Sequence, residues 1–227
     1  MAGLPLESKL PDFLADSQFG RLSAHDVLTG SWSMVFSITG DFDGTACTEL
    51  GMIAKLYRQF VSRNCRVICI SAGGIDRHEA FLRDVEETQD CKVKFPLVAD
   101  ESGALLTTLL MRKMVGGEPG HVLPSLVICD PDLTVQFSMV YPSSTGRNFY
   151  EVLRVIDSLQ VSRYFKVATP AHWMAGEPVF VLPEVSDAAA EEMFPKGVTR
   201  VSQGEGRPAC RLTPYPDVEV DDLVRDD

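Results

Sequence analysis

The sequence predicts an α/β fold, with a mixed sheet covered by helices on both faces. Short apolar segments alternate with amphipathic stretches through residues 1–160, and this alternation is typical of strands joined by helices. Two neighbouring apolar segments are joined instead by Pro131-Asp132, a pair that favours a tight turn. This pair adds an antiparallel hairpin at one side of the sheet.

The elements expected in the first half of the chain are recognised by their apolar periodicity. The expected strands are 9–13, 32–37 and 65–71, and the expected helices are 50–63 and 76–88. The segment 65–71 is almost continuously apolar, which fits a strand buried on both faces. The helix from Leu50 carries its apolar side chains on one stripe. Asp76 is placed to cap the next helix.

The second half of this region continues the alternation. The expected strands are 96–100, 123–130 and 133–141, and the expected helices are 103–114 and 148–160. The glycine-bearing segment after residue 114 is expected to be a loop. The resulting order of strands and helices indicates a thioredoxin-type core over residues 1–160.

The composition changes at about Val161. Residues 161–214 are rich in proline, and we expect a small accessory unit with little regular structure and too few residues for a core of its own. Residues 215–227 form an acidic tail, in which DVEVDDLVRDD carries six acidic groups and one arginine. Such a tail is expected to be solvated.

The totals exclude several classes of protein. The 227 residues carry a net charge of −11, which argues against a nucleic acid or an anionic membrane as partner. No apolar run approaches the ~20 residues that span a bilayer, and the first residues lack a secretory pattern. Six cysteines without a Cys-x-x-Cys pair, and scattered histidines, predict no metal and no cofactor. We therefore expect a soluble protein of the cytoplasm or another reducing compartment.

The loop 37–51, SITGDFDGTACTELG, is the candidate site. It joins a buried strand to a helix, where backbone N–H groups and the helix dipole favour an anion. Cys47 lies there, and a cysteine at a helix N-terminus is a better nucleophile than an ordinary one. The loop therefore indicates thiol chemistry.

Several segments carry a resemblance to a known family. They are PDFLAD, GRLSAHD, SWSMVFS, DF and TELG in the loop, YPSSTGRNFYEVLRVIDSLQ, KVATPAHW, VLP and FPKGV. Together they cover residues 5–214 and resemble the one-cysteine peroxiredoxins that have an extra C-terminal domain. The resemblance implies a thioredoxin-fold core, a small C-terminal dimerisation domain that is exchanged across a homodimer, and thiol-dependent reduction of peroxides.

The family's catalytic residues are not found at the matching positions. Its motif is Pro-x-x-x-Thr-x-x-Cys, with an arginine on a later strand. An alignment without gaps places the family's proline on Thr39, its threonine on Asp43, its cysteine on Ala46 and its arginine on Pro124. Cys47 is one residue beyond the family cysteine, a helical rotation of about 100° that turns the sulfur away from the pocket. Glu49 and Arg147 are the family-like residues expected beside the loop.

These departures predict a catalytically degenerate scaffold that acts as a homodimer or as a subunit of a larger assembly. One alternative is a thiol peroxidase that reduces hydrogen peroxide or alkyl hydroperoxides through Cys47, with the loop shifted by one residue. The other is a redox-sensing thiol that oxidises without turnover.

Two further features are open to a functional interpretation. Pro124 resembles the proline that faces the active-site loop in thioredoxins, which predicts a cis Leu123–Pro124 bond. Ser31, His25 and Asp132 lie at positions that can hold a hydrolase triad in the family. A strand-start serine, a surface histidine and a turn aspartate explain the same residues without catalysis, and we favour that explanation.

Overall fold

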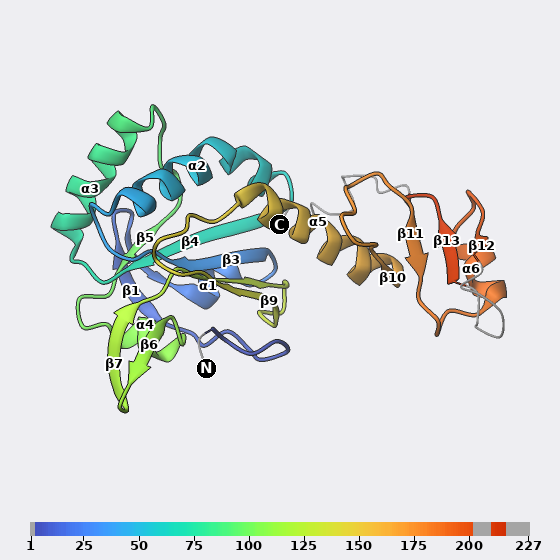
Figure 1. Cartoon of the computed structure of the whole chain (residues 1–227), viewed down its shortest axis with the longest axis horizontal. Coiled ribbons are helices and arrows are strands. Elements are labelled where there is room, and N and C mark those ends of the chain that lie inside the picture. Colours follow the sequence, from blue (N-terminus) through green and yellow to red (C-terminus); the bar gives the residue numbers. More distant parts are fainter. Residues whose placement is uncertain (1–2, 202–209, 217–227) are drawn as a thin grey trace. The chain divides into compact units, whose positions relative to one another are not determined.

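The computed structural model describes residues 3–201 and 210–216 (Figure 1). Residues 217–227 of the expected acidic tail lie outside this part. The chain separates into two compact units, Met1–Phe149 and Tyr150–Asp227. In the described part of the chain, no helix is long and apolar enough to cross a membrane.

A seven-stranded sheet forms the centre of the first unit, in the order β2-β1-β5-β4-β3-β8-β9. The strands are β1 (Leu14–Ser17), β2 (Gly20–Ser23), β3 (Trp32–Ser37), β4 (Cys65–Ser71), β5 (Leu97–Ala99), β8 (Ser125–Cys129) and β9 (Val135–Val140). The three strands β3, β4 and β5 are parallel, whereas β8 and β9 form an antiparallel hairpin at one edge. The predicted α/β class and its hairpin are thereby confirmed.

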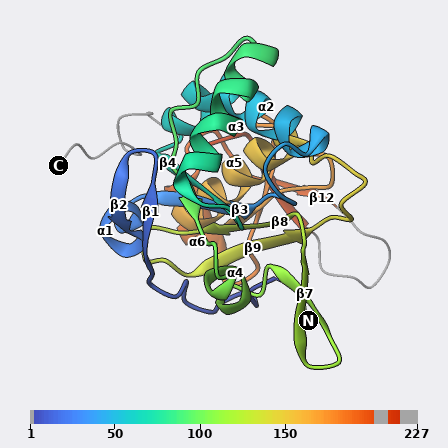
Figure 2. The same ribbon diagram turned by 90° about the vertical axis from the view of Figure 1, so that its left-hand side faces the viewer.

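Helices cover both faces of this sheet. On one face, α1 (Ala24–Leu28) and α4 (Ala104–Thr108) share a buried cluster with Val35, Ile68 and Val127. Figure 2 shows α2 (Gly44–Val61) and α3 (Ile75–Thr88) together on the opposite side from α4. All six residues of β3 are buried, which explains why its sequence does not alternate.

The helix predicted over 103–114 is wrong beyond Thr108. Leu110 has φ +55°, and the chain then forms the hairpin β6 (Arg112–Val115) and β7 (Glu118–Val122). The connecting Gly116 and Gly117 both have positive φ, 61° and 89°, as a tight hairpin turn requires. The segment expected to be a loop is therefore half of a hairpin.

Three smaller predictions also need correction. The expected strand 9–13 contains only a single bridge, from Lys9 to Thr134. The residue that caps α3 is Gly74, and Asp76 lies inside its first turn instead. The predicted cis Leu123–Pro124 bond is wrong: the bond is trans, like every peptide bond among the described residues. Ordinary hydrogen bonds hold this trans segment, from Ser37 Oγ to the Leu123 carbonyl (2.7 Å) and from the Tyr141 N–H to the Pro124 carbonyl (2.9 Å).

The second unit has a core of its own, contrary to the expectation from its length. It contains α5 (Phe149–Phe165), whose residues from Tyr150 onward belong to this unit, together with α6 (Asp187–Met193) and a four-stranded antiparallel sheet. The sheet order is β10-β11-β13-β12, with β10 at Val167–Ala168, β11 at Val179–Val181, β12 at Thr199–Val201 and β13 at Cys210–Thr213. Its buried cluster includes Trp173 and Phe194, whose large side chains compensate for the short strands.

Candidate functional site

The candidate loop leads into α2, which begins earlier than its apolar stripe indicates. The carboxylate of Asp43 accepts a hydrogen bond from the Ala46 N–H (2.9 Å) and is the N-cap of the helix. The helix therefore starts at Gly44, and both Ala46 and Cys47 lie in its first turns. An aspartate cap was a signal available in the sequence, and it explains this residue without a catalytic role.

Adjacent residues at the start of α2 point in different directions. Ala46 is only 1% exposed, whereas Cys47 is half-buried. The Cys47 sulfur lies 3.4 Å from Thr88 Oγ1 and 3.9 Å from Gln89 Nε2, at the end of α3. Thr88 already donates its hydroxyl hydrogen to the Asp84 carbonyl (2.7 Å), so the resting Cys47 thiol donates to Thr88.

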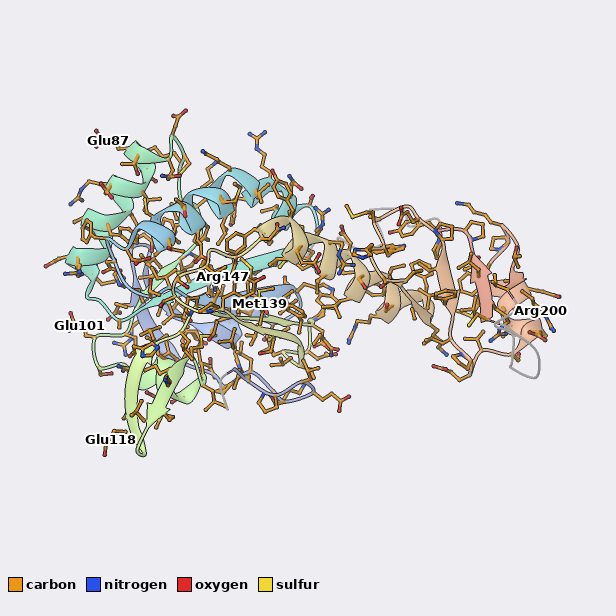
Figure 3. All side chains as sticks on the ribbon, viewed as in Figure 1. Glu87, Glu101, Glu118, Met139, Arg147 and Arg200 are labelled. Atoms are coloured by element: carbon orange, nitrogen blue, oxygen red, sulfur yellow. The ribbon has the colours of Figure 1, made fainter. Side chains whose placement is uncertain are left out.

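Glu49 and Arg147 form a buried ion pair. Figure 3 labels Arg147 within the first unit. Arg147 Nε donates to Glu49 Oε1 (2.9 Å), and its backbone N–H donates to the same oxygen (2.8 Å). The guanidinium also donates to the carbonyls of Ser125 (2.9 Å) and Ser37 (3.0 Å). Its donors are thus committed to the ends of β3 and β8 and to α2.

The remaining residues of the aligned motif offer little chemistry. Pro124 is buried at the start of β8 and has no side-chain donor for an oxyanion. Thr39 Oγ1 is buried and has no hydrogen-bond partner among the described residues. The structure therefore brings Glu49, Arg147 and Pro124 to one region, while the sulfur of Cys47 faces α3.

A second buried polar group lies between the loop and α3, and no motif in the sequence predicts it. Asp41 Oδ1 accepts a hydrogen bond from Ser71 Oγ (2.7 Å), and Asp41 Oδ2 lies 3.3 Å from Arg77 Nε and 3.5 Å from His78 Nε2. His78 is fully buried. A side chain at Gly73 would collide with Asp41 and His78, so this glycine allows the close packing.

Burial lowers the pKa of His78, although the Asp41 carboxylate opposes the shift. The unfolded chain then binds the proton more tightly than the folded one, so stability is lost as the pH falls below about 6.5.

We expect His78→Gln to weaken this pH dependence of the free energy of unfolding, measured by urea unfolding at pH 7.5 and 5.5. His121→Gln, at an exposed histidine, is the control. Equal pH dependence in wild type and His78→Gln would contradict the assignment.

Three of the other cysteines are poor nucleophiles. Burial raises the pKa of Cys65 and Cys69 far above the usual thiol range and that of Cys129 to about 12. None of the cysteines in the described residues belongs to a disulfide. Cys47 therefore differs from these three in exposure and in its place at a helix start.

The residues of the possible hydrolase triad have other roles. His25 Nε2 lies 2.8 Å from the Leu10 carbonyl, to which it donates. This nitrogen therefore cannot take a proton from a serine. Ser31 Oγ accepts from Arg66 Nε (3.2 Å), and the Asp132 carbonyl accepts from Lys9 (2.6 Å). The side-chain contacts of His25 and Ser31 support the structural explanation of these two residues.

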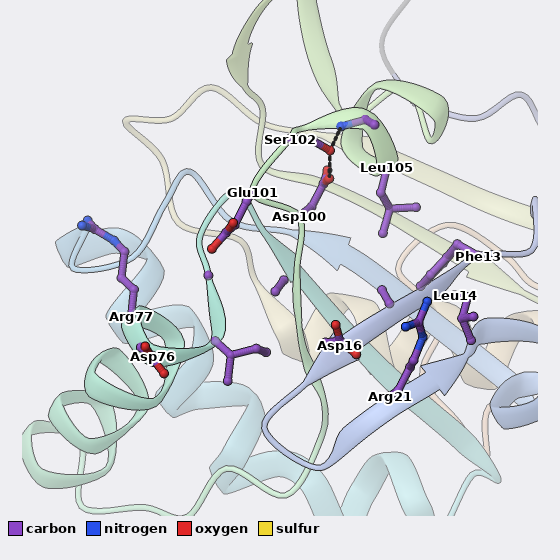
Figure 4. Close-up of a pocket in the computed structure, with 15 residues that line it drawn as sticks. Phe13, Leu14, Asp16, Arg21, Asp76, Arg77, Asp100, Glu101, Ser102 and Leu105 are labelled. Atoms are coloured by element: carbon purple, nitrogen blue, oxygen red, sulfur yellow. Dashed lines mark hydrogen bonds between the residues drawn. The ribbon is translucent and has the colours of Figure 1, made fainter.

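A groove of about 940 Å³ lies between β1, the start of α3 and residues 99–105 (Figure 4). Asp16 and Glu101 are among its lining residues, and Ser102 donates to Asp100 (3.2 Å) at one wall. No residue of α2 lines it. The thiol chemistry of Cys47 therefore does not take place in this groove.

Comparisons with known proteins give a consistent result. Residues 6–138 match the AhpC/TSA family, and residues 158–197 match the C-terminal domain of 1-Cys peroxiredoxin. The chain is 38% identical to Peroxiredoxin-6 of Gallus gallus, over 96% of this chain and all of the relative. It is 38% identical to a probable 1-Cys peroxiredoxin of Syntrichia ruralis, over 86% of this chain and 91% of the relative.

Solved structures agree with this result. The crystal structure of a cysteine-to-serine mutant of Peroxiredoxin 6 of Arenicola marina superimposes with a TM-score of 0.87 at 36% identity, covering 95% of this chain and all of that one. A yeast mitochondrial 1-Cys peroxiredoxin superimposes with a TM-score of 0.83 at 30% identity, covering 93% of this chain and all of that one. The thioredoxin-fold core and the accessory domain are thereby confirmed.

The relatives also correct the main functional prediction. The missing motif residues led to the conclusion that the chain is a catalytically degenerate scaffold, and that conclusion is wrong. The relatives that match most of its length are named Peroxiredoxin-6 or 1-Cys peroxiredoxin. Their names favour the alternative interpretation, a thiol peroxidase.

Proposed function

Because the chain belongs to the peroxiredoxin family, in its one-cysteine group, we propose that it is a thiol peroxidase that reduces hydrogen peroxide or alkyl hydroperoxides through Cys47. The supporting observation is the half-buried sulfur of Cys47 at the start of an 18-residue helix, beside the side-chain amide of Gln89. The other half-exposed thiols of the described residues do not lie at a helix start.

The reaction is a displacement at oxygen. The Cys47 thiolate attacks the terminal oxygen of the hydroperoxide, a sulfur–oxygen bond forms and the oxygen–oxygen bond breaks. Sulfur is oxidised to sulfenic acid. The leaving group is hydroxide from hydrogen peroxide or an alkoxide from an alkyl hydroperoxide, and it takes a proton from solvent to give water or an alcohol. The helix N-terminus favours the anionic sulfur.

The side chains of α3 provide the local hydrogen bonds for this reaction. Gln89 Nε2 is a donor toward the sulfur at 3.9 Å. The Thr88 hydroxyl accepts from the resting thiol, and rotation away from the Asp84 carbonyl would let it donate to the thiolate. Arg147 is committed to Glu49, so we assign that pair to positioning the loop rather than to the reacting atoms.

The proposal is tested by mapping oxidation after a brief exposure to one equivalent of hydrogen peroxide. Mass spectrometry is expected to find sulfenic acid, or its dimedone adduct, on Cys47 before any appears on Cys210. Catalytic turnover with dithiothreitol separates a peroxidase from a redox-sensing thiol, which is oxidised once and stops. Equal oxidation of Cys47 and Cys210 would defeat the proposal.

Gln89→Leu removes the amide donor near the sulfur while keeping a side chain of similar size. A hydrogen bond to a charged group contributes about 1.5–3 kcal/mol, so the second-order rate of Cys47 oxidation is expected to fall about tenfold or more. Stopped-flow measurement of peroxide reduction gives this rate. Gln59→Leu, at an exposed glutamine of α2, controls for the loss of an amide. An unchanged rate would show that Gln89 does not assist the sulfur.

The accessory domain supports a proposal on assembly. The matched C-terminal domain is the part of the chain that the family resemblance associates with dimerisation, and we propose that the protein is a homodimer through it. Sedimentation velocity is expected to give twice the 25.0 kDa chain mass. A larger mass would favour the assembly-subunit alternative. The cysteines of the described residues form no disulfide, which fits a reducing compartment.

A further inference from the structure

The groove of Figure 4 follows an edge of the sheet that is only partly paired. Strand β1 pairs with β2 along its whole length, but it pairs with β5 only through Ser17 and Val98. Strand β5 ends at Ala99, and the chain then leaves the sheet for the turn that precedes α4. Beside the rest of β1 the described residues place no strand, and the groove lies there instead.

The backbone of β1 presents hydrogen-bonding groups to this groove. The Phe13 carbonyl accepts the Ala24 N–H (2.9 Å), so the polar backbone groups of Phe13 face the side of β2. Successive residues of a strand turn their N–H and C=O groups to opposite edges, so those of Leu14 face the groove. An open strand edge of this kind is a template on which an extended peptide can pair.

The two sides of the groove differ in chemistry. Phe13, Ala15 and Leu105 line it and pack against the buried cluster that α1 and α4 share. Because side chains alternate along a strand, Asp16 points to the opposite face of the sheet, on which α3 lies. Asp76, in the first turn of α3, lines the groove as well. One side of the groove is therefore apolar and the other side is acidic.

Two arginines also line the groove, but both have acidic neighbours. Arg21 lies opposite Asp16 in the register of β1 and β2, where opposite charges attract. Arg77 Nε lies 3.3 Å from Asp41 Oδ2, and Asp41 does not line the groove. These arginines therefore do not balance the other carboxylates of the lining.

The carboxylates of Asp76 and Glu101 lie at the start of α3. Neither forms an ion pair within the part of the chain that the structure describes. A Cβ atom at Gly74, the N-cap of α3, would collide with Glu101 Oε1, so this carboxylate lies against the start of the helix. A helix N-terminus attracts anions, and Glu101 already supplies one here. The groove therefore favours a cationic ligand.

We propose that this groove binds an extended peptide in which basic and apolar residues alternate. The peptide adds a strand to β1 through hydrogen bonds to the backbone of Leu14. Its apolar side chains face Phe13 and Leu105, and its lysines or arginines face Asp76 and Glu101, because the side chains of a strand alternate between two faces. The inference is independent of the proposed peroxidase function, since no residue of α2 lines the groove.

Binding is tested with the full chain and a short probe, a fluorescein-labelled Lys-Val-Arg-Val-Lys peptide with an amidated C-terminus. Fluorescence anisotropy is expected to show saturable binding that weakens as salt is added, since salt screens the ion pairs. The matched Glu-Val-Glu-Val-Glu peptide is expected not to bind. Absence of binding of the basic peptide up to about 1 mM, or equal binding of both peptides, would overturn the proposal.

A pair of double variants tests the place of binding. Asp76→Asn/Glu101→Gln removes the two carboxylates and is expected to raise the Kd of the basic peptide about five- to tenfold at low salt. Glu87→Gln/Glu118→Gln makes the same change of net charge at exposed residues outside the groove and is expected to leave the Kd unchanged. Equal weakening by both double variants would show a general attraction to an acidic protein and would overturn the groove as the site.

Peptides with N-methyl groups test the pairing with β1, because a methylated nitrogen cannot donate a hydrogen bond. One peptide is methylated at both valines, and the other at the central arginine. In a strand added to β1, only one of these sets faces β1. One methylated peptide is therefore expected to bind at least about tenfold more weakly, whereas the other keeps the affinity of the unmodified probe. The same affinity for both methylated peptides would overturn strand addition.

Discussion

Cys47→Ser is expected to lose peroxide reduction, with the rate falling about 100-fold or more. A serine hydroxyl stays protonated at neutral pH, and oxygen cannot be oxidised to the equivalent of a sulfenic acid. Three of the remaining cysteines, Cys65, Cys69 and Cys129, do not replace it, because they are buried and their pKa is raised. Hydrogen peroxide consumption with dithiothreitol as reductant measures the loss.

Cys210→Ser is the matched control for this result, because Cys210 lies in β13 of the second unit. It is expected to keep the wild-type rate. Unfolding curves show whether Cys47→Ser folds normally, which is expected because its sulfur is half-buried and makes only long contacts with α3. A Cys47→Ser protein that reduces peroxide at the wild-type rate would place the reaction at another residue.

The central strands could be predicted because burial leaves a direct mark on sequence. Strands β3 and β4 are mostly apolar and are buried except at Arg66, and both lie between other strands with helices on each side. The segment 103–114 could not be assigned in the same way, since its leucines and methionines fit either a helix or a strand. Gly116-Gly117 was the available signal for the hairpin, and its positive φ values show why.

The core of the second unit was not predictable from segment length. Val167, Val179 and Phe194 come from separate elements and meet only in the folded unit. Each element is short, and only the cooperation of several of them produces a buried cluster. Counting the residues of each segment therefore underestimates the apolar surface that a four-stranded sheet and two helices bury together.

In the candidate site too, features set by neighbouring residues could be predicted, whereas contacts between residues far apart in the sequence could not. Asp43 caps α2 through a hydrogen bond to a residue three positions later, and an aspartate in front of a helix is a recognised sign of an N-cap. The contacts of Cys47 with Thr88 and Gln89 depend on how α2 packs on α3, and no motif records that. The Asp41–His78 pair is similar, because the two residues are brought together only by the close approach of Gly73.

Arg147→Met is expected to destabilise the first unit by about 3–5 kcal/mol, because it leaves the Glu49 carboxylate buried without its cation. Both side chains are almost fully buried, with 0% of Arg147 and 4% of Glu49 exposed. The substitution also removes donors from the carbonyls of Ser37 and Ser125 at the ends of β3 and β8. Urea unfolding monitored by circular dichroism gives the free energy of unfolding.

Two further variants separate the effect of the unpaired Glu49 carboxylate on stability from the effect of lost packing around Arg147. Lys92→Met breaks the exposed Lys92–Glu86 pair of the same unit and is expected to cost less than about 1 kcal/mol. The double variant Glu49→Leu/Arg147→Met removes both charges, and it is expected to recover part of the stability that Arg147→Met loses. If the double variant were less stable than Arg147→Met, the buried carboxylate would not be the cause. The bonds from Arg147 to the strand ends would then account for the stability, and the arginine would act chiefly as a clamp between β3 and β8.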